Sequence, residues 1–136
     1  MHLQSKKCLS PVGGRALGEN HPVMASRKCN QTTNVFMVYG NGTIQHDESG
    51  MCLRPTGDCS DPADNTELVL SKDCGDPKQK FVLSDDGLLK HSRSKTCVRP
   101  VYGVKNVPDN TRIVIHSECD VDKFAFSFSG KKCCVS

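Results

Sequence analysis

The nine cysteines are the residues whose type and spacing point most directly to chemistry, because a cysteine can form a disulfide, bind zinc or act as a nucleophile. Six of them form three similarly spaced pairs: Cys8 and Cys29, Cys52 and Cys74, Cys97 and Cys119. The same pair in three copies predicts three disulfides, each contributing on the order of 3 kcal/mol to stability. Zinc would instead need clustered Cys-x-x-Cys or Cys and His ligands, which the sequence lacks, so we expect no metal site.

The other three cysteines, Cys59, Cys133 and Cys134, have no such pattern. Adjacent cysteines rarely bond to each other. Either one tail cysteine pairs with Cys59 and the other stays free, or Cys133 or Cys134 supports a dimer, disulfide-linked or non-covalent. Both alternatives remain open.

The cysteine content also predicts the compartment. Disulfides persist in oxidising surroundings, so we expect a secreted, extracellular protein. Glycosylation sequons at Asn30 and Asn41 agree with secretion. The first residues lack the cationic and apolar segments of a signal peptide, so we expect a mature or excised domain.

The histidines offer a second route to chemistry, but their pattern predicts a structural role. His2, His46 and His91 recur in threefold register, each followed three residues later by a serine. A catalytic centre brings different groups to one point and so usually breaks such a repeat. The sequence also lacks the G-x-S-x-G, H-E-x-x-H and phosphate-loop motifs. We therefore expect no enzyme and no cofactor.

The same markers divide the chain into three similar units. The phrases CLSP, CLRP and CVRP begin at Cys8, Cys52 and Cys97. We place one domain at 1–130, with units at 2–45, 46–90 and 91–130 and a cysteine-containing tail at 131–136. Alternating apolar residues and frequent turns predict four short strands per unit, in the second unit at 44–47, 51–56, 67–71 and 80–85. Three such units predict an all-β fold, a β-trefoil, because three blades are too few for a propeller.

Hairpin turns are expected where glycine follows an apolar strand. Asn41-Gly42 and Asp86-Gly87 are strong signals, and Ser129-Gly130 is a weaker third.

Composition excludes several classes of protein. Only 36% of the residues are hydrophobic and nine of the 136 are cysteine, so disulfides must supplement a thin core. The net charge of +3 comes from basic residues scattered among acids, which gives a nucleic-acid partner little support. No apolar run approaches the ~18 residues of a transmembrane helix, so we expect no membrane insertion.

The phrases at 44–74 and 89–119 resemble the repeat of the mussel galactose-binding lectins, the mytilectins. Asp64-Asn65-Thr66 and Asp109-Asn110-Thr111 match that family's N-N-T turn. Cys-Leu near the start of a unit, with its disulfide partner after the third strand, is similar to the ricin-B-type lectin repeat. The resemblance covers nearly all of residues 2–130. It implies a β-trefoil lectin that binds galactose-type sugars on cell-surface or secreted glycans.

The resemblance also implies where the sugar would bind. The family's H-P-Y-G-G segment holds the sugar through its His and a backbone Gly. Here Ser10, Arg54 and Arg99 replace that His, and glycines remain at Gly13, Gly14, Gly57 and Gly103.

The family's H-x-D-x-H segment is best kept in the third unit, as His116, Glu118 and Asp120. Residues two apart on a strand share a face, so we expect these three side chains to point together. At the acid position the second unit has Asp73 and the first has Lys28. The predicted ligand-binding residues are Arg99, Gly103, His116, Glu118 and Asp120 in the third unit, and Arg54, Gly57 and Asp73 in the second.

Where arginine replaces the family's His, the acid is retained, which leaves two interpretations. Arg54–Asp73 and Arg99–Glu118 are ion pairs that only brace each unit, or each arginine and acid bind a sugar together. Because the planar arginine fork pairs with anions, such a sugar could carry carboxylate or sulfate. The third unit is the best equipped, the second is next, and the first lacks the acid. With no tryptophan present, Tyr102 is the candidate stacking platform.

We interpret the chain as an extracellular carbohydrate-binding lectin module that recognises galactose-type or acidic glycans through shallow sites acting together. The alternative is a trefoil protein-interaction domain, receptor-binding or inhibitor-like, with degenerate sugar sites. A toxin's targeting domain would need a further segment.

Overall fold

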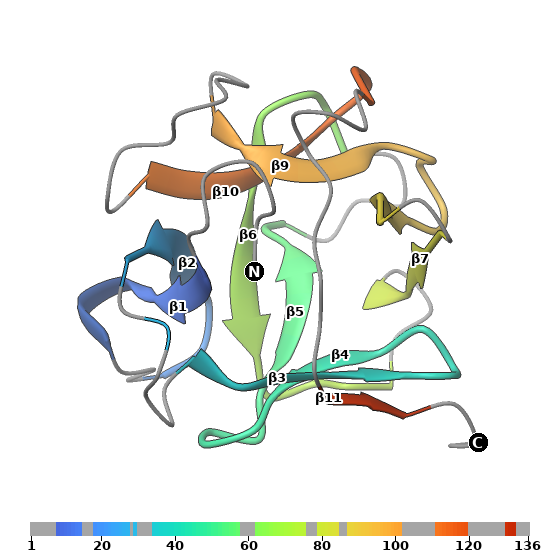
Figure 1. The fold of residues 1–136 in the computed structure, drawn as a ribbon. Coiled ribbons are helices and arrows are strands. Elements are labelled where there is room, and N and C mark those ends of the chain that lie inside the picture. The colour runs from blue at the N-terminus through green and yellow to red at the C-terminus, as the bar shows by residue number, and fades with distance from the viewer. Residues whose placement is uncertain are drawn as a thin grey trace.

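The computed structural model describes residues 8–14, 18–27, 29, 34–57, 62–75, 79–84, 87–101, 111–119 and 130–132. Within them, eleven strands join in one sheet that curls around a central core (Figure 1). The first repeat supplies β1 (Cys8–Pro11), the 3-10 turn η1 (Val12–Gly14), β2 (His21–Ser26) and β3 (Phe36–Tyr39). The second supplies β4 (Ile44–His46), β5 (Cys52–Pro55), β6 (Thr66–Ser71) and β7 (Phe81–Leu83). The third supplies β8 (Leu89–His91), β9 (Cys97–Pro100) and β10 (Thr111–His116), and β11 (Gly130–Lys132) ends the described chain.

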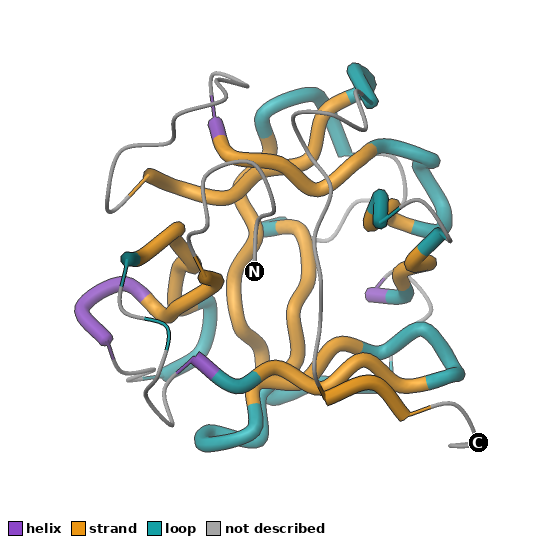
Figure 2. The backbone as a smooth tube through the Cα atoms, viewed as in Figure 1, coloured by secondary structure: helices purple, strands orange, loops and turns teal. Residues whose placement is uncertain are grey.

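The three repeats meet through their longest strands, β2, β6 and β10, which pair antiparallel in a cycle. His21 of β2 lies opposite Leu70 of β6, and Thr66 of β6 lies opposite Ile115 of β10. Thr111 of β10 lies opposite Ala25 of β2 and closes the cycle. In the view shared by Figure 1 and Figure 2, β6 runs through the middle of the picture, with β2 to its left and β10 across its upper end. The closure removes the free sheet edges that these strands would otherwise expose.

Short hairpins branch from the central strands, as the sequence predicts. In the β3–β4 hairpin the N–H of Gly42 donates to the carbonyl of Tyr39 (3.0 Å), and Gly42 has φ +95°. The Gly87 turn makes the same bond to Ser84 between β7 and β8. The turn signal at Ser129-Gly130 is wrong at Gly130. That glycine begins β11, whose backbone pairs in parallel with β3.

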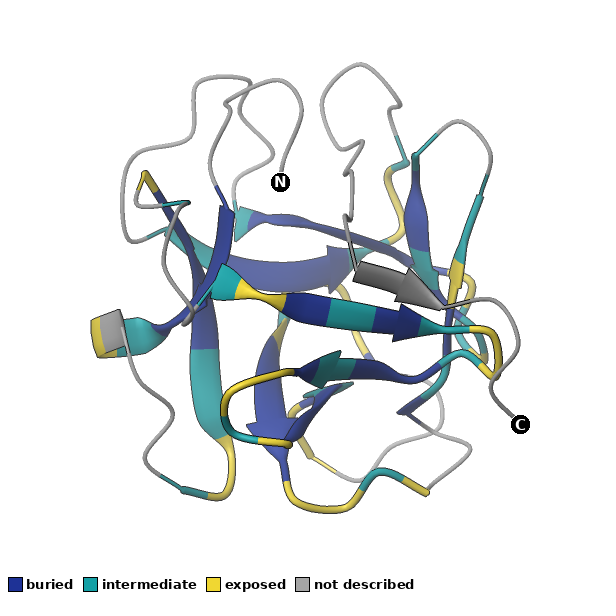
Figure 3. Ribbon diagram, turned by 60° about the horizontal axis from the view of Figure 1, so that its bottom comes forward, coloured by how far each residue is buried: buried dark blue, intermediate teal, exposed yellow. Residues whose placement is uncertain are grey.

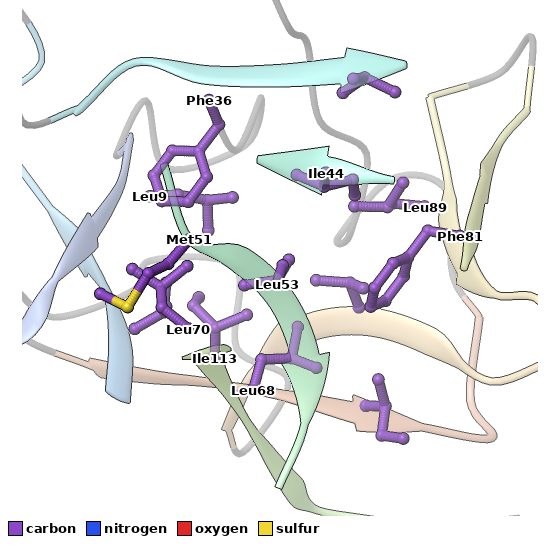
Figure 4. Close-up of a cluster of buried hydrophobic side chains, with 14 of the residues drawn as sticks. Leu9, Phe36, Ile44, Met51, Leu53, Leu68, Leu70, Phe81, Leu89 and Ile113 are labelled. Carbon is purple, nitrogen blue, oxygen red and sulfur yellow. The ribbon is translucent and has the colours of Figure 1, made fainter. Parts of the chain in front are cut away.

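The core is built from inward-facing residues of all three repeats (Figure 3). Along β6, Leu68 and Leu70 are completely buried, and so is Leu53 of β5. Figure 4 shows these side chains converging with Phe36, Phe81 and others from neighbouring strands. Complete burial of one such side chain contributes about 1.5–3 kcal/mol. The core therefore fixes which strand residues face inward and which face solvent.

The repeated His-x-x-Ser motif is structural in the two described repeats. His46 and His91 are completely buried, and their Nδ1 atoms lie 2.7 and 2.8 Å from the hydroxyls of Ser49 and Ser94. The backbone carbonyl of each histidine accepts the N–H of the residue four positions later, which closes a tight turn before β5 or β9. His2 lies outside the described residues.

All three predicted disulfides are present: Cys8–Cys29, Cys52–Cys74 and Cys97–Cys119, with Cα separations of 5.5, 5.4 and 5.6 Å. Each ties the start of one strand to the segment that follows its antiparallel neighbour. Cys59, Cys133 and Cys134 lie outside the described residues. In the described part of the chain, no three His, Cys, Asp or Glu residues gather as a metal site requires. No helix found there is long and apolar enough to cross a membrane.

Candidate functional site

Arg54 and Arg99, the residues that replace the lectin histidine, sit at equivalent places on the outward face of the barrel. Arg54 of β5 lies opposite Val69 of β6, and Arg99 of β9 lies opposite Val114 of β10. His116 is two residues beyond Val114 and so shares the face with Arg99. The neighbouring residues of β5 and β9 point into the core, so the pleat holds each arginine outward.

In the third repeat Arg99 pairs with Glu118. The Nη1 atom of Arg99 donates to Oε1 of Glu118 at 2.8 Å. The arginine side chain is only 7% exposed, whereas that of Glu118 is 57% exposed. The second carboxylate oxygen, Oε2, has no bond to any described residue. It remains directed to solvent as a charged acceptor.

His116 lies beside this pair as a hydrogen-bond donor. Its Nδ1 accepts the backbone N–H of Glu118 at 2.9 Å, which in the neutral ring places the proton on Nε2. Nε2 is 3.6 Å from Oδ2 of Asp64, beyond hydrogen-bonding distance. Strand β10 ends at His116, so the expected strand does not continue through Glu118, and Asp120 lies outside the described residues. The segment bends at Ser117, and Glu118 is positioned by its contacts with His116 and Arg99 instead.

Asp64, a residue that the sequence does not assign to the site, reaches it from the preceding repeat. Oδ1 of Asp64 accepts the N–H of Ser117 and Oδ2 accepts its hydroxyl, both at 2.9 Å. These bonds, the hydroxyl first, hold the pKa of Asp64 below its usual value, with a smaller effect from nearby His116 and Arg99. The only sequence signal was the Asp64-Asn65-Thr66 turn. Asn65 adopts φ +68° there, a conformation that asparagine tolerates.

In the second repeat Arg54 has a different partner from the one expected. Its Nη2 atom donates to Oδ1 of Asn20 at 2.5 Å and lies 3.6 Å from Oε2 of Glu19. The predicted Arg54–Asp73 pair is therefore wrong. Oδ1 of Asp73 instead accepts the N–H of Gly75 at 3.1 Å.

Side-chain length explains this difference between repeats. At the Arg54 site, the first repeat contributes the longer acid, Glu19, and the acid that follows β6 is the shorter Asp73. At the Arg99 site the lengths are reversed: the second repeat contributes the shorter acid, Asp64, and the acid that follows β10 is the longer Glu118. In both repeats the arginine pairs with the glutamate, the acid that has the extra methylene.

Glu19 bonds to the end of β6 in the second repeat, as Asp64 bonds to the residue after β10 in the third. Its Oε2 accepts the hydroxyl of Ser71 at 2.6 Å, and Oε1 accepts the N–H of Lys72 at 2.8 Å. The backbone bond from Lys72, followed by the one from Ser71, lowers the pKa of Glu19. Ser71 occupies the place of His116, and its hydroxyl proton is already used. The second repeat therefore lacks the free donor of the third.

The remaining predicted site residues are only partly described. Gly57 follows β5 with φ +81°, and a Cβ there would meet nothing within 4 Å. In the first repeat the Ser10 hydroxyl is buried and donates to the carbonyl of Pro11 at 3.1 Å. Gly103 and Asp120, as well as Tyr102 and Lys28, lie outside the described residues.

A hollow of about 570 Å³ adjoins Arg54 between the first and second repeats. Its lining residues are Asn20, Pro22, Thr56, Asn65, Thr66, Glu67 and Val69. Asn20, which accepts from Arg54, forms part of its wall. The surface beside this arginine is therefore concave and lined by polar and apolar groups alike.

A family model described as MytiLec, alpha-D-galactose-binding lectin, matches residues 1–130. The chain belongs to this family. None of the curated protein sequences matches it significantly. The MytiLec match covers all three repeats, including both arginine sites. This chain is thus a carbohydrate-binding lectin module, although arginine or serine stands where the resemblance places histidine.

Solved structures agree on the β-trefoil fold of this MytiLec-family lectin. A designed three-fold symmetric protein, ThreeFoil, is 16% identical, with TM-score 0.71 and 89% of both chains covered. A ricin B-like lectin from Macrolepiota procera in complex with lactose is 13% identical, with TM-score 0.58, covering 87% of this chain and 89% of that one.

A non-toxic homologue of type II RIPs from Momordica charantia (bitter gourd), in complex with alpha-methyl-D-galactoside, is 14% identical with TM-score 0.63. The match covers 82% of this chain and 42% of that protein. At these identities the likeness concerns the fold.

Proposed function

We propose that this lectin binds neutral galactose-type ends of glycans, chiefly at the third-repeat site formed by Arg99, His116 and Glu118. One observation carries the proposal: a carboxylate oxygen with no bond to any described residue, and a ring nitrogen whose partner among the described residues lies 3.6 Å away, belong to two neighbouring side chains of one segment. Oε2 of Glu118 is the acceptor, and Nε2–H of His116 is the donor. Adjacent sugar hydroxyls both donate and accept, so the pair matches them, and bonds to a carboxylate are the stronger kind.

Charge favours neutral glycans over acidic ones. Arg99 is neutralised by Glu118 at 2.8 Å, and Asp64 adds a second carboxylate beside His116. Among the described residues of the site, one arginine stands against two carboxylates. A sialylated or sulfated sugar would be repelled, so the arginine serves to orient Glu118 and does not attract an anion.

The second repeat offers a weaker version of the site. Arg54 and Asp73 are both present but do not pair, and the Ser71 hydroxyl already donates to Glu19. The first repeat lacks the acid, because Lys28 stands in its place. We infer one principal site and one secondary site, whose simultaneous use would strengthen binding to clustered glycans.

The decisive experiment is titration of the oxidised protein with methyl α-D-galactoside and with sialylated and sulfated galactosides, at low and moderate salt. We expect the neutral sugar to bind with little salt dependence and the acidic ones to bind at least tenfold more weakly. Glu118→Gln should reduce binding at least tenfold, whereas Asp73→Asn, its matched control in the second repeat, should have a smaller effect. Preference for acidic sugars, or unchanged affinity in Glu118→Gln, would refute the proposal. Absence of any glycan binding would favour the protein-interaction alternative.

We also propose that the module is extracellular, acts without catalysis and presents its sites to cell-surface or secreted glycans. Three disulfides support an oxidising compartment. Association through Cys133 or Cys134 would double the number of sites per particle. Light scattering with and without reductant, compared with a Cys133→Ser/Cys134→Ser variant, separates a disulfide-linked dimer from a non-covalent dimer and a monomer.

A further inference from the structure

A small hollow on the β3–β4 hairpin is lined by alternating residues of one glycosylation sequon and its neighbours. It has a volume of about 180 Å³ and is lined by Tyr39, Asn41, Thr43, Gln45, Cys52 and Cys74. Val38 and Ile44 are buried in the core, and Thr43 is buried beside them, whereas Asn41 is exposed and Tyr39 and Gln45 are half-buried. None of the residues that line the hollow belongs to the third repeat, which contributes Arg99 and Glu118.

Asn41 is positioned at the tip of this hairpin as a modification site. It is exposed, and Asn41-Gly42-Thr43 is an N-x-T sequon. Its Oδ1 accepts the N–H of Thr43 at 3.0 Å, which orients the side-chain amide. Nδ2 makes no bond to any described residue. At the equivalent places in the second repeat the sequence has Asp86 and Leu88, so only this hairpin carries a sequon.

Tyr39 supplies an aromatic surface two residues before Asn41. Its hydroxyl donates to Oε1 of Gln45 at 3.0 Å, and Nε2 of Gln45 donates to the carbonyl of Gly50 at 2.8 Å. These bonds fix the ring across the hairpin on the side that borders the hollow. The large apolar surface of an aromatic ring can pack against the C–H face of a pyranose.

We propose that Asn41 is N-glycosylated, and that the first N-acetylglucosamine lies in this hollow against Tyr39. The donor is an oligosaccharide carried on a polyisoprenyl pyrophosphate in a eukaryotic secretory pathway. Nδ2 of Asn41 bonds to the anomeric carbon as the bond from that carbon to the pyrophosphate oxygen breaks. The lipid pyrophosphate leaves, and the amide proton passes to a base of the transferase. The sugar then covers a hollow that the bare hairpin exposes, and should stabilise the fold.

The test begins with the full chain secreted from eukaryotic cells behind a signal peptide. Peptide mapping after release of glycans by an amidase in heavy-oxygen water reports occupancy at Asn41 and, separately, at Asn30. Asn41→Gln should remove the glycan at this site, and Asn30→Gln should leave it in place. An unoccupied Asn41 in the secreted, folded protein would overturn the proposal.

Whether the sugar lies against Tyr39 is tested by measuring the unfolding midpoint. Glycans are trimmed to a single N-acetylglucosamine, and the unfolding midpoint is compared with that of Asn41→Gln. We expect the sugar to raise the midpoint by a few degrees in the parent and to raise it less in Tyr39→Leu. Each trimmed protein is compared with the Asn41→Gln variant of the same background, parent or Tyr39→Leu. Any direct destabilisation by Tyr39→Leu therefore cancels. An equal increase in both backgrounds would show that the sugar does not lie on Tyr39.

Discussion

Asp64 in the second repeat holds Ser117 in the third through both carboxylate oxygens, at 2.9 Å to the backbone N–H and 2.9 Å to the hydroxyl. Glu19 holds Ser71 and Lys72 in the same way one repeat earlier. Each of these two acids therefore bonds to the segment that carries a candidate site acid, Asp73 or Glu118. The candidate sites are built across repeat boundaries, and their geometry depends on how the repeats pack together.

The first prediction concerns pH. Folding lowers the pKa of both Glu19 and Asp64, so their ionised forms stabilise the fold at pH values above the ordinary carboxyl pKa of ~4. That contribution is lost as the pH falls through the lowered folded-state values. We expect the thermal midpoint to decline between about pH 5 and pH 3. Calorimetry should find a shallower decline in a Glu19→Gln/Asp64→Asn variant than in the parent.

Asp64→Asn tests whether the second repeat completes the third-repeat site. The amide keeps one acceptor but cannot accept both bonds from Ser117, so the segment that carries Glu118 should loosen. We expect galactoside affinity to fall several-fold at pH 7, with a small decrease in the unfolding midpoint. Glu67→Gln changes an exposed acid of β6, three residues after Asp64; it is the control and should bind normally. Normal affinity in Asp64→Asn would show that the third-repeat site is complete without Asp64.

The sequence predicts the strands, the disulfides and the repeat because each depends on local pattern. Second-repeat strands begin and end within two residues of their expected positions. The partner of Arg54 depends on which acid of two repeats has the length to reach it. No property of Arg54 or Asp73 alone indicates that Glu19 approaches from another repeat.

The position of Glu118 is a second feature that the sequence pattern does not fully determine. Period-two alternation places His116 and Glu118 together, and they do contact each other. The reason is different: β10 ends at His116, and the imidazole accepts the backbone N–H of Glu118. The two residues contact each other through the imidazole and a backbone N–H, at a strand ending that the pattern does not locate. That their side chains bind one sugar together stays a prediction.

Lys95→Gly is expected to stabilise the protein. Lys95 adopts φ +62°, whereas Gly50 at the equivalent turn of the second repeat adopts φ +73°. The left-handed conformation costs a side-chain-bearing residue about 1–2 kcal/mol, offset in part by the greater freedom of glycine when unfolded. The net gain should be ~0.5–1 kcal/mol in urea unfolding. Gly50→Ala should destabilise, and a loss of stability in Lys95→Gly would contradict the argument.

Ser49→Ala and Ser94→Ala should each destabilise the fold by ~1–2 kcal/mol, because each removes the hydroxyl that bonds Nδ1 of a buried histidine. Neither serine lies at the proposed sugar site, so galactoside affinity should not change. Chemical denaturation and titration on the same samples measure both effects. Reduced affinity with unchanged stability would instead connect the His-x-x-Ser motif to ligand binding.

The Cys97–Cys119 disulfide should matter for binding as well as stability. Cys97 lies opposite His116 in the β9–β10 ladder, and Cys119 directly follows Glu118, so the bond fixes both ends of the donor-acceptor pair. Replacing both cysteines with serine should cost about 3 kcal/mol and reduce galactoside affinity strongly, even where the protein remains folded. The Cys8→Ser/Cys29→Ser variant should lose similar stability but keep its affinity, because the first repeat does not contribute to the principal site. Titration well below both unfolding midpoints separates the two effects, and equal affinities in the two variants would mean that Glu118 does not need this disulfide.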